Sequence, residues 1–331
     1  MAPPPFRLAP DARAPRLAVF DCDADEAELF HRLAGDHGVD VRTTGDPLSA
    51  GLDVPTGTRC VSVAHTSKVA ARTLRAVRAV GVERLITRSV GVDHVDLDAA
   101  HEVGVTVDNV TYSPDGVADF TVMLVLMALR HATRAAEAGS PDSCVRARDL
   151  RDLTVGVLGA GSIGRAVIAR LHGFGCNVLA CTNRPTTGLD VALVDLDELL
   201  ARSDVVSLHV PLTAGTRHLI GPEQLASMRR DAVLINTARG AVVDTDALVV
   251  ALEDGRLGGA ALDVVDGADA LLDRLRRQPN VTLTPHVAYR TVRTLHETVA
   301  ATLTTCTTHE RNHTDDQADD RDPVRRMLGG A

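Results

Sequence analysis

The sequence is short of aromatic residues and has almost no lysine. Among its 331 residues there is no Trp, there are only two Tyr, and Lys68 is the single lysine beside many arginines. The scarcity of aromatic rings predicts a core of aliphatic side chains. The lack of lysine excludes the Gly-Lys-Ser/Thr loop of P-loop enzymes. It also leaves Lys68 as the only residue on which a Schiff base could form.

Long apolar runs are missing as well. The longest, FTVMLVLMAL over residues 120–129, is too short to span a bilayer and predicts a buried helix. The N-terminus, MAPPPFRLAPDARAPR, contains prolines and no apolar stretch of the kind found in signal peptides. The six cysteines form no Cys-x-x-Cys pair and have no regular spacing, which is typical of reduced thiols. These absences predict a soluble, cytoplasmic protein without a membrane partner.

The chain also lacks an excess of basic charge. Its formal net charge is −9, whereas a nucleic-acid partner favours a basic face, so no nucleic acid is expected to bind. One segment, HERNH over residues 309–313, fits the zinc motif His-Glu-x-x-His. It lies at the expected end of the last helix, so the match is interpreted as a coincidence and no metal site is predicted.

The sequence does contain two series of short apolar runs that alternate with helical stretches, such as 25–34 and 68–80. Strands separated by helices predict parallel βα units. The first series is RLAVF (16–20), VDVRT (39–43), CVSVA (60–64), RLITRS (84–89) and VTVDN (105–109). The second has the six strands expected of a dinucleotide-binding sheet: LTVGVLG (153–159), NVLACT (177–182), DVVSLHV (204–210), AVLINT (232–237), GAALDV (259–264) and VTLTP (281–285).

The predicted fold class is α/β, with two doubly wound parallel-sheet domains, Rossmann-like or flavodoxin-like, and an active-site cleft between them. A helix over 291–309 follows the second series and can return to the first domain, which would make that domain discontinuous. We expect a flexible tail over 1–14, a substrate domain over 15–112 plus 287–310, an NAD(P)-binding domain over 113–286 and a disordered tail over 311–331.

A glycine-rich turn follows the first strand of the second series. Its sequence is Gly159-Ala160-Gly161-Ser162-Ile163-Gly164, between an apolar strand and a predicted helix. In such a turn the first glycine permits the tight bend, the second lets the backbone approach a pyrophosphate, and the third allows close helix–strand packing. The amides of the helix N-terminus then face the phosphates. This pattern predicts dinucleotide binding.

The acid that normally binds the ribose hydroxyls is missing. It is expected about 20 residues after the turn, where CTNRP (181–185) places Thr182, Asn183 and Arg184. Arginine accommodates the 2′-phosphate of NADP(H), and the two neutral side chains can add hydrogen bonds. We therefore favour NADP(H) as the cofactor. NAD(H) stays open, with Arg184 as a solvated loop charge.

Polar residues follow three later strands, in INTARG (235–240), ALDVVDG (261–267) and LTPHVAY (283–289). Ligands of open α/β sheets bind at these carboxyl ends. Arg239 can hold a carboxylate and polarise the neighbouring carbonyl, and His286 can donate a proton to the carbonyl oxygen. The pair suits reduction of a 2-keto acid. Taken singly, Arg239 could be a surface ion-pair partner and His286 a capping or core histidine.

Together these segments resemble the D-2-hydroxyacid dehydrogenase family from about residue 15 to residue 309. SVGVDHVDLDAA (89–100) and LHVPLTAGTRHLIG (208–221) belong to the similarity, and YSPDGVADFTVMLVLMALRH (112–131) is most similar to the D-lactate dehydrogenases of glycopeptide (vancomycin) resistance. That branch reduces pyruvate to D-lactate for peptidoglycan precursors ending in D-Ala-D-Lac and tends to use NADPH. The resemblance therefore implies pyruvate as substrate; glyoxylate, hydroxypyruvate or a larger 2-keto acid is the alternative.

The resemblance also implies residue roles. Arg239 would bind the substrate carboxylate and carbonyl, and His286 would be the acid/base. The amides of Val90 and Gly91 would hold the carboxylate, with Tyr112 near the side-chain pocket. The cofactor site would be bordered by Val210, Pro211, Thr237, Ala238 and Asp263. Family members are commonly dimers, so a homodimer is expected, with the helix after Tyr112 in the interface; burial of that helix within its own chain explains its apolar face equally well.

The sequence departs from the family at one catalytic position. The family has a Glu five residues after the Asp of its Leu-Asp-Val motif, paired with the catalytic His, whereas this chain has Ala268. Asp266 and Asp269 flank the gap and could replace the Glu, or both could be solvated loop residues. Loss of the Glu leaves a second hypothesis open: a catalytically impaired dinucleotide-binding relative that acts by association.

Overall fold

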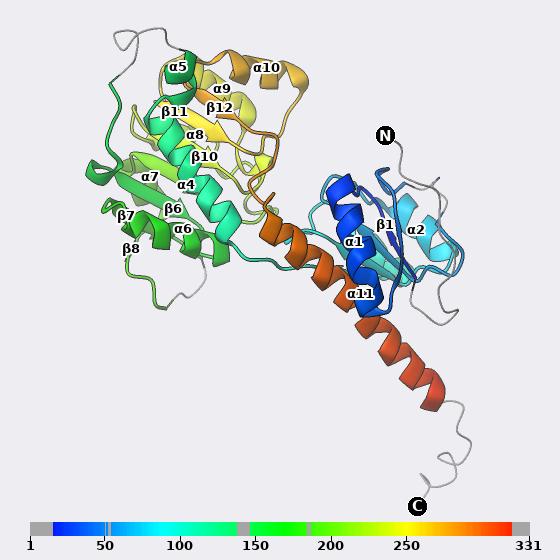
Figure 1. The fold of residues 1–331 in the computed structure, drawn as a ribbon. Coiled ribbons are helices and arrows are strands. Elements are labelled where there is room, and N and C mark those ends of the chain that lie inside the picture. The colour runs from blue at the N-terminus through cyan, green and yellow to red at the C-terminus, as the bar shows by residue number, and fades with distance from the viewer. Residues whose placement is uncertain (1–15, 50, 52–53, 138–145, 184–186, 320–331) are drawn as a thin grey trace, which may run out of the picture. The chain divides into compact units, whose positions relative to one another are not determined.

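The computed structural model describes residues 16–49, 51, 54–137, 146–183 and 187–319, with side chains described as far as residue 308. The chain divides into two compact units, Met1–Ser113 with Val292–Ala331, and Pro114–Thr291 (Figure 1). The predicted tail over 1–14 lies outside the described residues. No helix in the described ranges is both long and apolar enough to cross a membrane.

The first unit is a parallel sheet in the order β2-β1-β3-β4-β5. This is the flavodoxin-like order, in which the chain winds outward on both sides of β1. Each strand coincides with one of the predicted apolar runs. The strands are β1 (Arg16–Val19), β2 (Asp40–Thr43), β3 (Cys60–Val63), β4 (Arg84–Thr87) and β5 (Thr106–Asn109).

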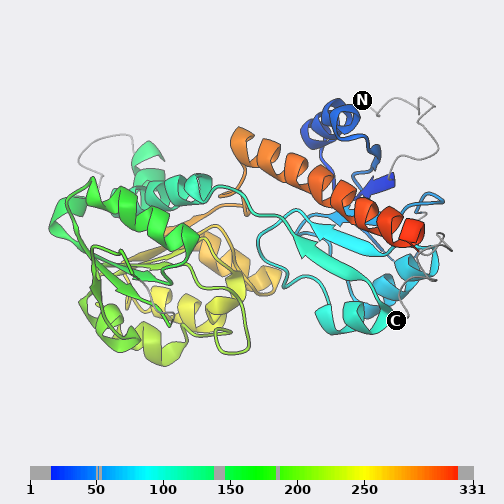
Figure 2. The same ribbon diagram turned by 90° about the horizontal axis from the view of Figure 1, so that it is seen from below.

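Helices cover both faces of this sheet. α2 (Ala71–Ala79) and α3 (Leu97–Val103) pack on one face, whereas α1 (Ala24–His37) and the long α11 (Val292–Asp319) lie side by side on the other (Figure 2). Short polar signals set the ends of α1: the Asp23 side chain accepts a hydrogen bond from the Glu26 amide, and Gly38 ends the helix in the left-handed conformation.

α11 is longer than the sequence predicted. Its buried residues Val299, Leu303 and Cys306 pack against β1 and α1, which completes the core on that face of the sheet. The disorder expected from residue 311 is wrong as far as residue 319, because the helix continues to Asp319. Residues 311–319 contain no Gly or Pro, so nothing in the sequence interrupts the helix there.

The second unit is a parallel sheet in the order β12-β11-β10-β9-β6-β7-β8. Read from β8, this is the 3-2-1-4-5-6 order of dinucleotide-binding domains with one further strand at its end, so the topology reverses between β6 and β9. The sequence predicted six of these strands and missed β8, which has only two residues. The strands are β6 (Thr154–Leu158), β7 (Asn177–Cys181), β8 (Ala192–Leu193), β9 (Val205–Leu208), β10 (Val233–Asn236), β11 (Gly259–Leu262) and β12 (Val281–Leu283).

Two aliphatic cores lie on the two faces of this sheet. The buried helix predicted from the apolar run 120–129 is α4 (Asp115–Leu129), which packs with α6 (Ser162–His172) on one face. The other face is covered by α7 (Leu196–Arg202), α8 (Pro222–Ser227), α9 (Thr245–Glu253) and α10 (Asp269–Arg277). α5 (Ala132–Glu137) and the 3-10 turns η2 (Leu150–Asp152) and η3 (Gly240–Val242) complete the unit. Met123 of α4 is exposed, whereas six of its apolar residues are buried: Val117, Ala118, Val122, Leu124, Val125 and Leu129.

Candidate active site

The glycine turn has the geometry that its sequence predicts. Gly159 adopts a φ of +99°, and a Cβ there would lie 2.6 Å from the His209 carbonyl oxygen. A Cβ on Gly164 would lie 2.0 Å from the Gly159 carbonyl oxygen, so only glycine allows α6 to approach the turn after β6. By contrast, nothing lies within 4 Å of a Cβ at Gly161. The first and third glycines are thus required by packing, whereas the second faces open space that a ligand can approach.

The start of α6 offers backbone donors at the same place. Gly161 is the N-cap of this helix, and within the described residues no side chain accepts from its first turn. The amides of Ser162 and Ile163 therefore face the open space as the positive end of the helix dipole, which suits a pyrophosphate. The glycine spacing, the open side and the uncapped amides fit a dinucleotide.

Two of the residues predicted to contact the adenosine ribose border this turn. The Gly159 amide donates to the Cys181 carbonyl at 2.8 Å, so Thr182 and Asn183, which follow at the end of β7, lie beside the turn. Arg184 lies outside the described residues, and its role stays a prediction. The sequence interpretation missed Arg165, directly after the third glycine, whose Nη1 donates to the Thr187 carbonyl at 3.2 Å.

The segment after β9 closes the other side of the glycine turn. The His209 amide donates to the Leu158 carbonyl at 2.7 Å, and Val210 Cγ1 lies 3.0 Å from the Cβ position of Gly159. Pro211 follows, with its carbonyl accepting from Thr216 Oγ1 at 2.6 Å. Val210 and Pro211 therefore lie beside the turn, and their contact with the ribose stays a prediction.

His209 was not singled out from the sequence, yet its imidazole is held 2.9 Å from Ser207 Oγ. Burial lowers the pKa of His209 from its ordinary 6.5 to about 4. A base whose pKa is depressed by folding takes up its proton more readily in the unfolded chain. Its contribution to stability is therefore complete above pH 6.5 and is lost as the pH falls towards 4.

This shift gives a testable pH dependence. We expect the free energy of unfolding to fall by about 2–3 kcal/mol between pH 7 and pH 4.5 through this group, since each pKa unit corresponds to about 1.4 kcal/mol. A His209→Asn variant should lose this part of the pH dependence. Urea denaturation of both proteins across that range measures the difference, and parallel curves would contradict the assignment to His209.

The turn after β10 carries Arg239. Asn236, 1% exposed, holds this turn from within: its Nδ2 donates to the Arg239 carbonyl at 2.9 Å, and its Oδ1 accepts from the Ala238 amide at 3.0 Å. Thr237 Oγ1 lies 2.9 Å from Thr121 Oγ1 on α4. The sequence interpretation missed Asn236 and Thr121, although a polar residue at the end of an aliphatic strand was a signal for Asn236.

Arg239 itself is half-buried, and its Nη1 donates to the Ala238 carbonyl at 2.8 Å. Gly240, the next residue, packs directly on the loop after β11, because a Cβ there would lie 2.4 Å from the Asp266 nitrogen. The backbone on both sides of Arg239 is therefore fixed, and its guanidinium is carried at the carboxyl edge of the sheet.

His286 follows β12 two strands away from Arg239, at the same edge. Its backbone has a φ of +55°, and its amide donates to the Asp263 carbonyl at 2.9 Å. The Tyr289 ring meets the imidazole edge-on, with ring centres 5.7 Å apart. Asp263 is 2% exposed and lies between the turns of Arg239 and His286 in the strand order.

The two candidate replacements for the family Glu occupy exposed positions. The Asp266 carboxylate is 57% exposed and lies 3.9 Å from the Arg217 guanidinium. Its backbone carbonyl accepts from Thr245 Oγ1 at 2.5 Å, which ties this loop to the start of α9. Asp269 is the first residue of α10, directly after Ala268 at the N-cap. A role for either carboxylate beside His286 stays a prediction.

In the first unit, the loop after β4 carries the two amides that were predicted to bind the substrate carboxylate. Ser89 Oγ donates to the Gly91 carbonyl at 2.7 Å, and Asn109 Nδ2 donates to the Val90 carbonyl at 2.9 Å. These two hydrogen bonds hold the loop through its carbonyls. The amides of Val90 and Gly91 donate to no residue in the described part of the chain. They are available to a carboxylate. Tyr112, partly buried, follows β5 in the same unit.

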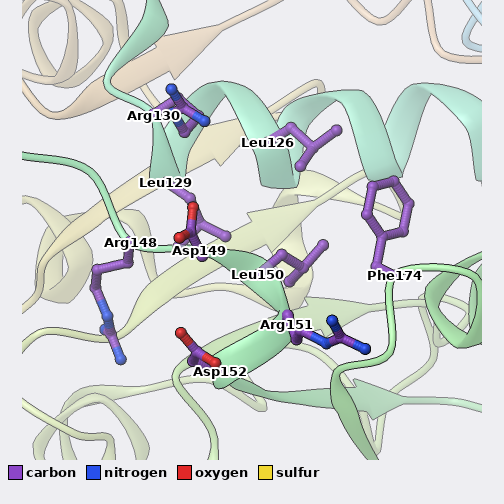
Figure 3. A pocket seen from close by; sticks show the side chains of 9 residues that line it. All are labelled: Leu126, Leu129, Arg130, Arg148, Asp149, Leu150, Arg151, Asp152 and Phe174. Atoms are coloured by element: carbon purple, nitrogen blue, oxygen red, sulfur yellow. The ribbon is translucent and has the colours of Figure 1, made fainter.

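A cavity of about 360 Å³ lies elsewhere in the second unit (Figure 3). Leu126 and Leu129 of α4, the segment Arg148–Asp152 before β6, and Phe174 before β7 line it. It is therefore at the amino ends of the strands, opposite the edge that carries the glycine turn. Elsewhere, the described residues contain no group of three or more His, Cys, Asp or Glu able to hold a metal; the HERNH side chains lie outside that part.

Comparisons with known proteins give a consistent picture. A family model described as the NAD-binding domain of D-isomer-specific 2-hydroxyacid dehydrogenases matches residues 121–288. D-specific alpha-keto acid dehydrogenases of Enterococcus faecalis and Enterococcus faecium are 46% and 43% identical, over 89% of this chain and 97% of each relative. A solved D-lactate dehydrogenase from Aquifex aeolicus, complexed with NAD and lactic acid, is 30% identical with a TM-score of 0.81, covering 90% of this chain and 96% of that one.

Proposed function

Since this chain belongs to the D-2-hydroxyacid dehydrogenase family, we propose that it reduces pyruvate to D-lactate with NADPH. It is an oxidoreductase of the D-lactate dehydrogenase type with an NAD-binding Rossmann-type domain. We assign the substrate domain to the first unit. The observation that carries the proposal is that the second unit presents the glycine turn, Arg239 and His286 at one edge of one sheet.

Two backbone amides and the guanidinium of Arg239 are the groups that we propose to bind the substrate. The amides of Val90 and Gly91 bind the substrate carboxylate, because their N–H groups are available. Hydrogen bonds from Asn109 and Ser89 to their carbonyls hold the loop in place. Arg239 donates to the carboxylate and to the neighbouring carbonyl oxygen, in the fork geometry that arginine offers to planar acceptors. Tyr112 borders the substrate side chain. Polarisation by Arg239 makes the carbonyl carbon more electrophilic.

His286 supplies the proton. When bound, the reduced nicotinamide provides the hydride that the C2 carbonyl carbon accepts. As negative charge develops on the carbonyl oxygen, the imidazolium of His286 transfers its proton to that oxygen and becomes neutral. The keto acid gains one hydride and one proton and leaves as the 2-hydroxy acid. The reverse reaction uses neutral His286 as the base.

The preference for NADPH rests on the residues after β7. Thr182 and Asn183 carry no charge that would repel a 2′-phosphate, and Arg184 would pair with it. In the relatives with NAD bound, the family site accepts the dinucleotide without that phosphate, so NADH is the alternative cofactor of this chain.

This cofactor preference can be measured through absorbance of the reduced nicotinamide with pyruvate. We expect kcat/KM to be higher with NADPH than with NADH, and an Arg184→Gln variant to lose about tenfold in kcat/KM with NADPH only, as for a charge-assisted hydrogen bond. Arg151→Gln, at the opposite edge of the same unit, is the matched control. Equal rates with both cofactors in the unchanged protein would refute the preference.

The same assay separates the remaining hypotheses. Faster turnover of glyoxylate, hydroxypyruvate or a larger 2-keto acid would replace pyruvate as the substrate. Tight NADPH binding without turnover of any 2-keto acid would favour the relative that acts by association, for which Ala268 in place of the family Glu is the supporting observation.

The biological setting of the proposal follows from the similarity to the glycopeptide-resistance branch. D-lactate made in the cytoplasm would supply peptidoglycan precursors that end in D-Ala-D-Lac. We propose a homodimer as the working form, as in the family, with no nucleic-acid or membrane partner.

A further inference from the structure

The loop after β11 contains one of the three Asp-Gly steps of the chain, which are Asp115-Gly116, Asp254-Gly255 and Asp266-Gly267. At such a step the glycine nitrogen can attack Cγ of the preceding side chain, because glycine has no Cβ to hinder the approach. The attack requires a backbone outside a helix, a side chain in contact with water and a glycine N–H that is not hydrogen-bonded. The three steps differ in these requirements.

Asp266-Gly267 meets every requirement. Both residues are exposed and lie between β11 and α10, and the Asp266 carboxylate is 57% exposed. The Gly267 amide donates to no residue in the part of the chain that the structure describes. Thr245 Oγ1 donates to the Asp266 carbonyl at 2.5 Å, and because the C=O and N–H of a trans peptide point in opposite directions, the Gly267 N–H points away from this contact. The hydrogen bond also polarises the peptide group, which makes the N–H easier to deprotonate.

The other two steps are protected. Asp115-Gly116 begins α4, where the backbone is helical, and its carboxylate is paired with Arg170 at 2.9 Å. Asp254-Gly255 is exposed like Asp266-Gly267, but its glycine amide donates to the Leu252 carbonyl at 3.1 Å. It is therefore a matched internal control: the same two residues at the same kind of exposure in the same unit, with the amide engaged.

From these differences we propose that Asp266-Gly267 is the site at which this chain forms isoaspartate. The Gly267 nitrogen bonds to Cγ of the protonated Asp266 carboxyl group, and the N–H proton and the hydroxyl group leave together as water, which closes a succinimide ring. Water then adds to the ring carbonyl on the Cα side and breaks its bond to nitrogen. The main chain now runs through Cβ and Cγ, and the former main-chain carbonyl is a carboxylate. One water leaves and one enters, so no oxidant or reductant is needed.

This modification has a consequence for the turn of Arg239. The loop after β11 lies directly on Gly240, because a Cβ on that glycine would lie 2.4 Å from the Asp266 nitrogen and 2.4 Å from the Val265 carbonyl carbon. Isoaspartate lengthens the main chain of the loop by one carbon atom, and such a close contact leaves no room for it. Since Arg239 binds the substrate carboxylate in the proposed function, on which this consequence rests, KM for the keto acid rises. The NADPH dissociation constant stays unchanged, because the glycine turn is not part of this contact.

The test is storage of the full chain in warm, near-neutral buffer, followed by peptide mapping with mass spectrometry. The succinimide is recognised by the loss of one water, and isoaspartate by methyl transfer from a protein isoaspartate methyltransferase, the class of enzyme that recognises this residue. We expect Asp266-Gly267 to convert about fivefold faster than Asp254-Gly255, as for one hydrogen bond that must break first. KM for pyruvate should rise in proportion to the isoaspartate found at residue 266.

Two variants separate this site from general ageing of the protein. Asp266→Glu keeps the carboxylate but adds a methylene group, so the ring closes less readily. Measured against its own starting activity, this variant should lose activity more slowly than the unchanged protein. Asp254→Glu makes the same change at the protected step, and it should lose activity at the rate of the unchanged protein.

Each outcome decides a different point. Conversion of Asp254-Gly255 as fast as that of Asp266-Gly267 would overturn the inference, and so would prolonged storage without isoaspartate at residue 266. An unchanged KM in protein that carries isoaspartate there would overturn the consequence for Arg239. The peptide map does not depend on turnover. If the fresh protein reduces no 2-keto acid, the proposed function fails, whereas the map still decides whether this step is the site of modification.

Discussion

We expect replacement of His286, the proposed general acid, with glutamine to lower kcat for 2-keto acid reduction by about 10²–10⁴-fold, the usual effect of removing a general acid. Glutamine keeps a polar side chain at the loop but has no proton to transfer near neutral pH. The carbonyl oxygen would then have to take its proton from water. Binding of NADPH should be unaffected, because the glycine turn and the start of α6 do not involve this loop. Steady-state rates with pyruvate, beside NADPH titrations, measure both effects.

His218→Gln is the matched control for this substitution. His218 is exposed, lies in the same unit and also has a positive φ, of 52°, so the variant reproduces any cost of placing glutamine in the left-handed region. We expect its kcat to stay at the unchanged value. A His286→Gln variant as active as His218→Gln would remove His286 from the mechanism.

Replacing Arg88 with methionine lowers the free energy of unfolding by about 3–5 kcal/mol, the cost of leaving one partner of a buried ion pair behind. Arg88 is 5% exposed in the first unit. Its Nε and Nη2 donate to the Glu26 carboxylate at 2.7 and 3.2 Å, and Nη2 also donates to the Phe20 carbonyl at 2.7 Å. Nη1 donates to Ser62 Oγ at 3.1 Å, and the guanidinium lies 5.9 Å from the ring centre of Phe30. One side chain thus joins α1, β3 and the end of β1.

The measurement is urea denaturation of the single variants and of the double variant Glu26→Gln with Arg88→Met. The double variant should lose less than the sum of the two single losses, because no unpaired charge remains. Arg59→Met is the control: the Arg59 side chain is 40% exposed and its Nη1 lies 3.7 Å from the Glu83 carboxylate, and an exposed pair of this kind contributes less than about 1 kcal/mol. If Arg88→Met and Arg59→Met lower the free energy of unfolding equally, the buried ion pair contributes no more to stability than the exposed one, which contradicts the prediction.

Local patterns predicted most of the fold. The apolar runs gave every strand of the first unit and six of the second, and the glycine spacing gave the turn before α6, because both depend on residues that are neighbours in sequence. β8 was not predicted, because a strand of two residues is too short to show an alternating pattern. The extension of α11 beyond residue 311 was not predicted, because the polar composition of residues 311–319 favours disorder even though they contain no helix breaker.

The candidate site was likewise predictable from the sequence only in part. Arg239 and His286 could be proposed as site residues because polar residues at strand ends are conspicuous in an aliphatic sheet. The Asp263 carboxylate accepts three hydrogen bonds that were not predicted, since their donors lie 21 to 25 residues further along the chain and meet it only when β11 and β12 pair. Asn236, Arg165 and His209 act through partners that spacing alone does not reveal.

The return of α11 to the first unit sets an order of events during synthesis. Val299, Leu303 and Cys306 belong to the same buried core as Leu17 and Val19, yet the ribosome makes the whole of Pro114–Thr291 between them. The second unit can therefore fold as it emerges. Until α11 has been made, α1 is the described helix that covers this face of the first unit's sheet, and it covers the face only in part. A chain released early would carry a finished dinucleotide-binding unit beside an unfinished partner, and its exposed strands would be the part that chaperones bind.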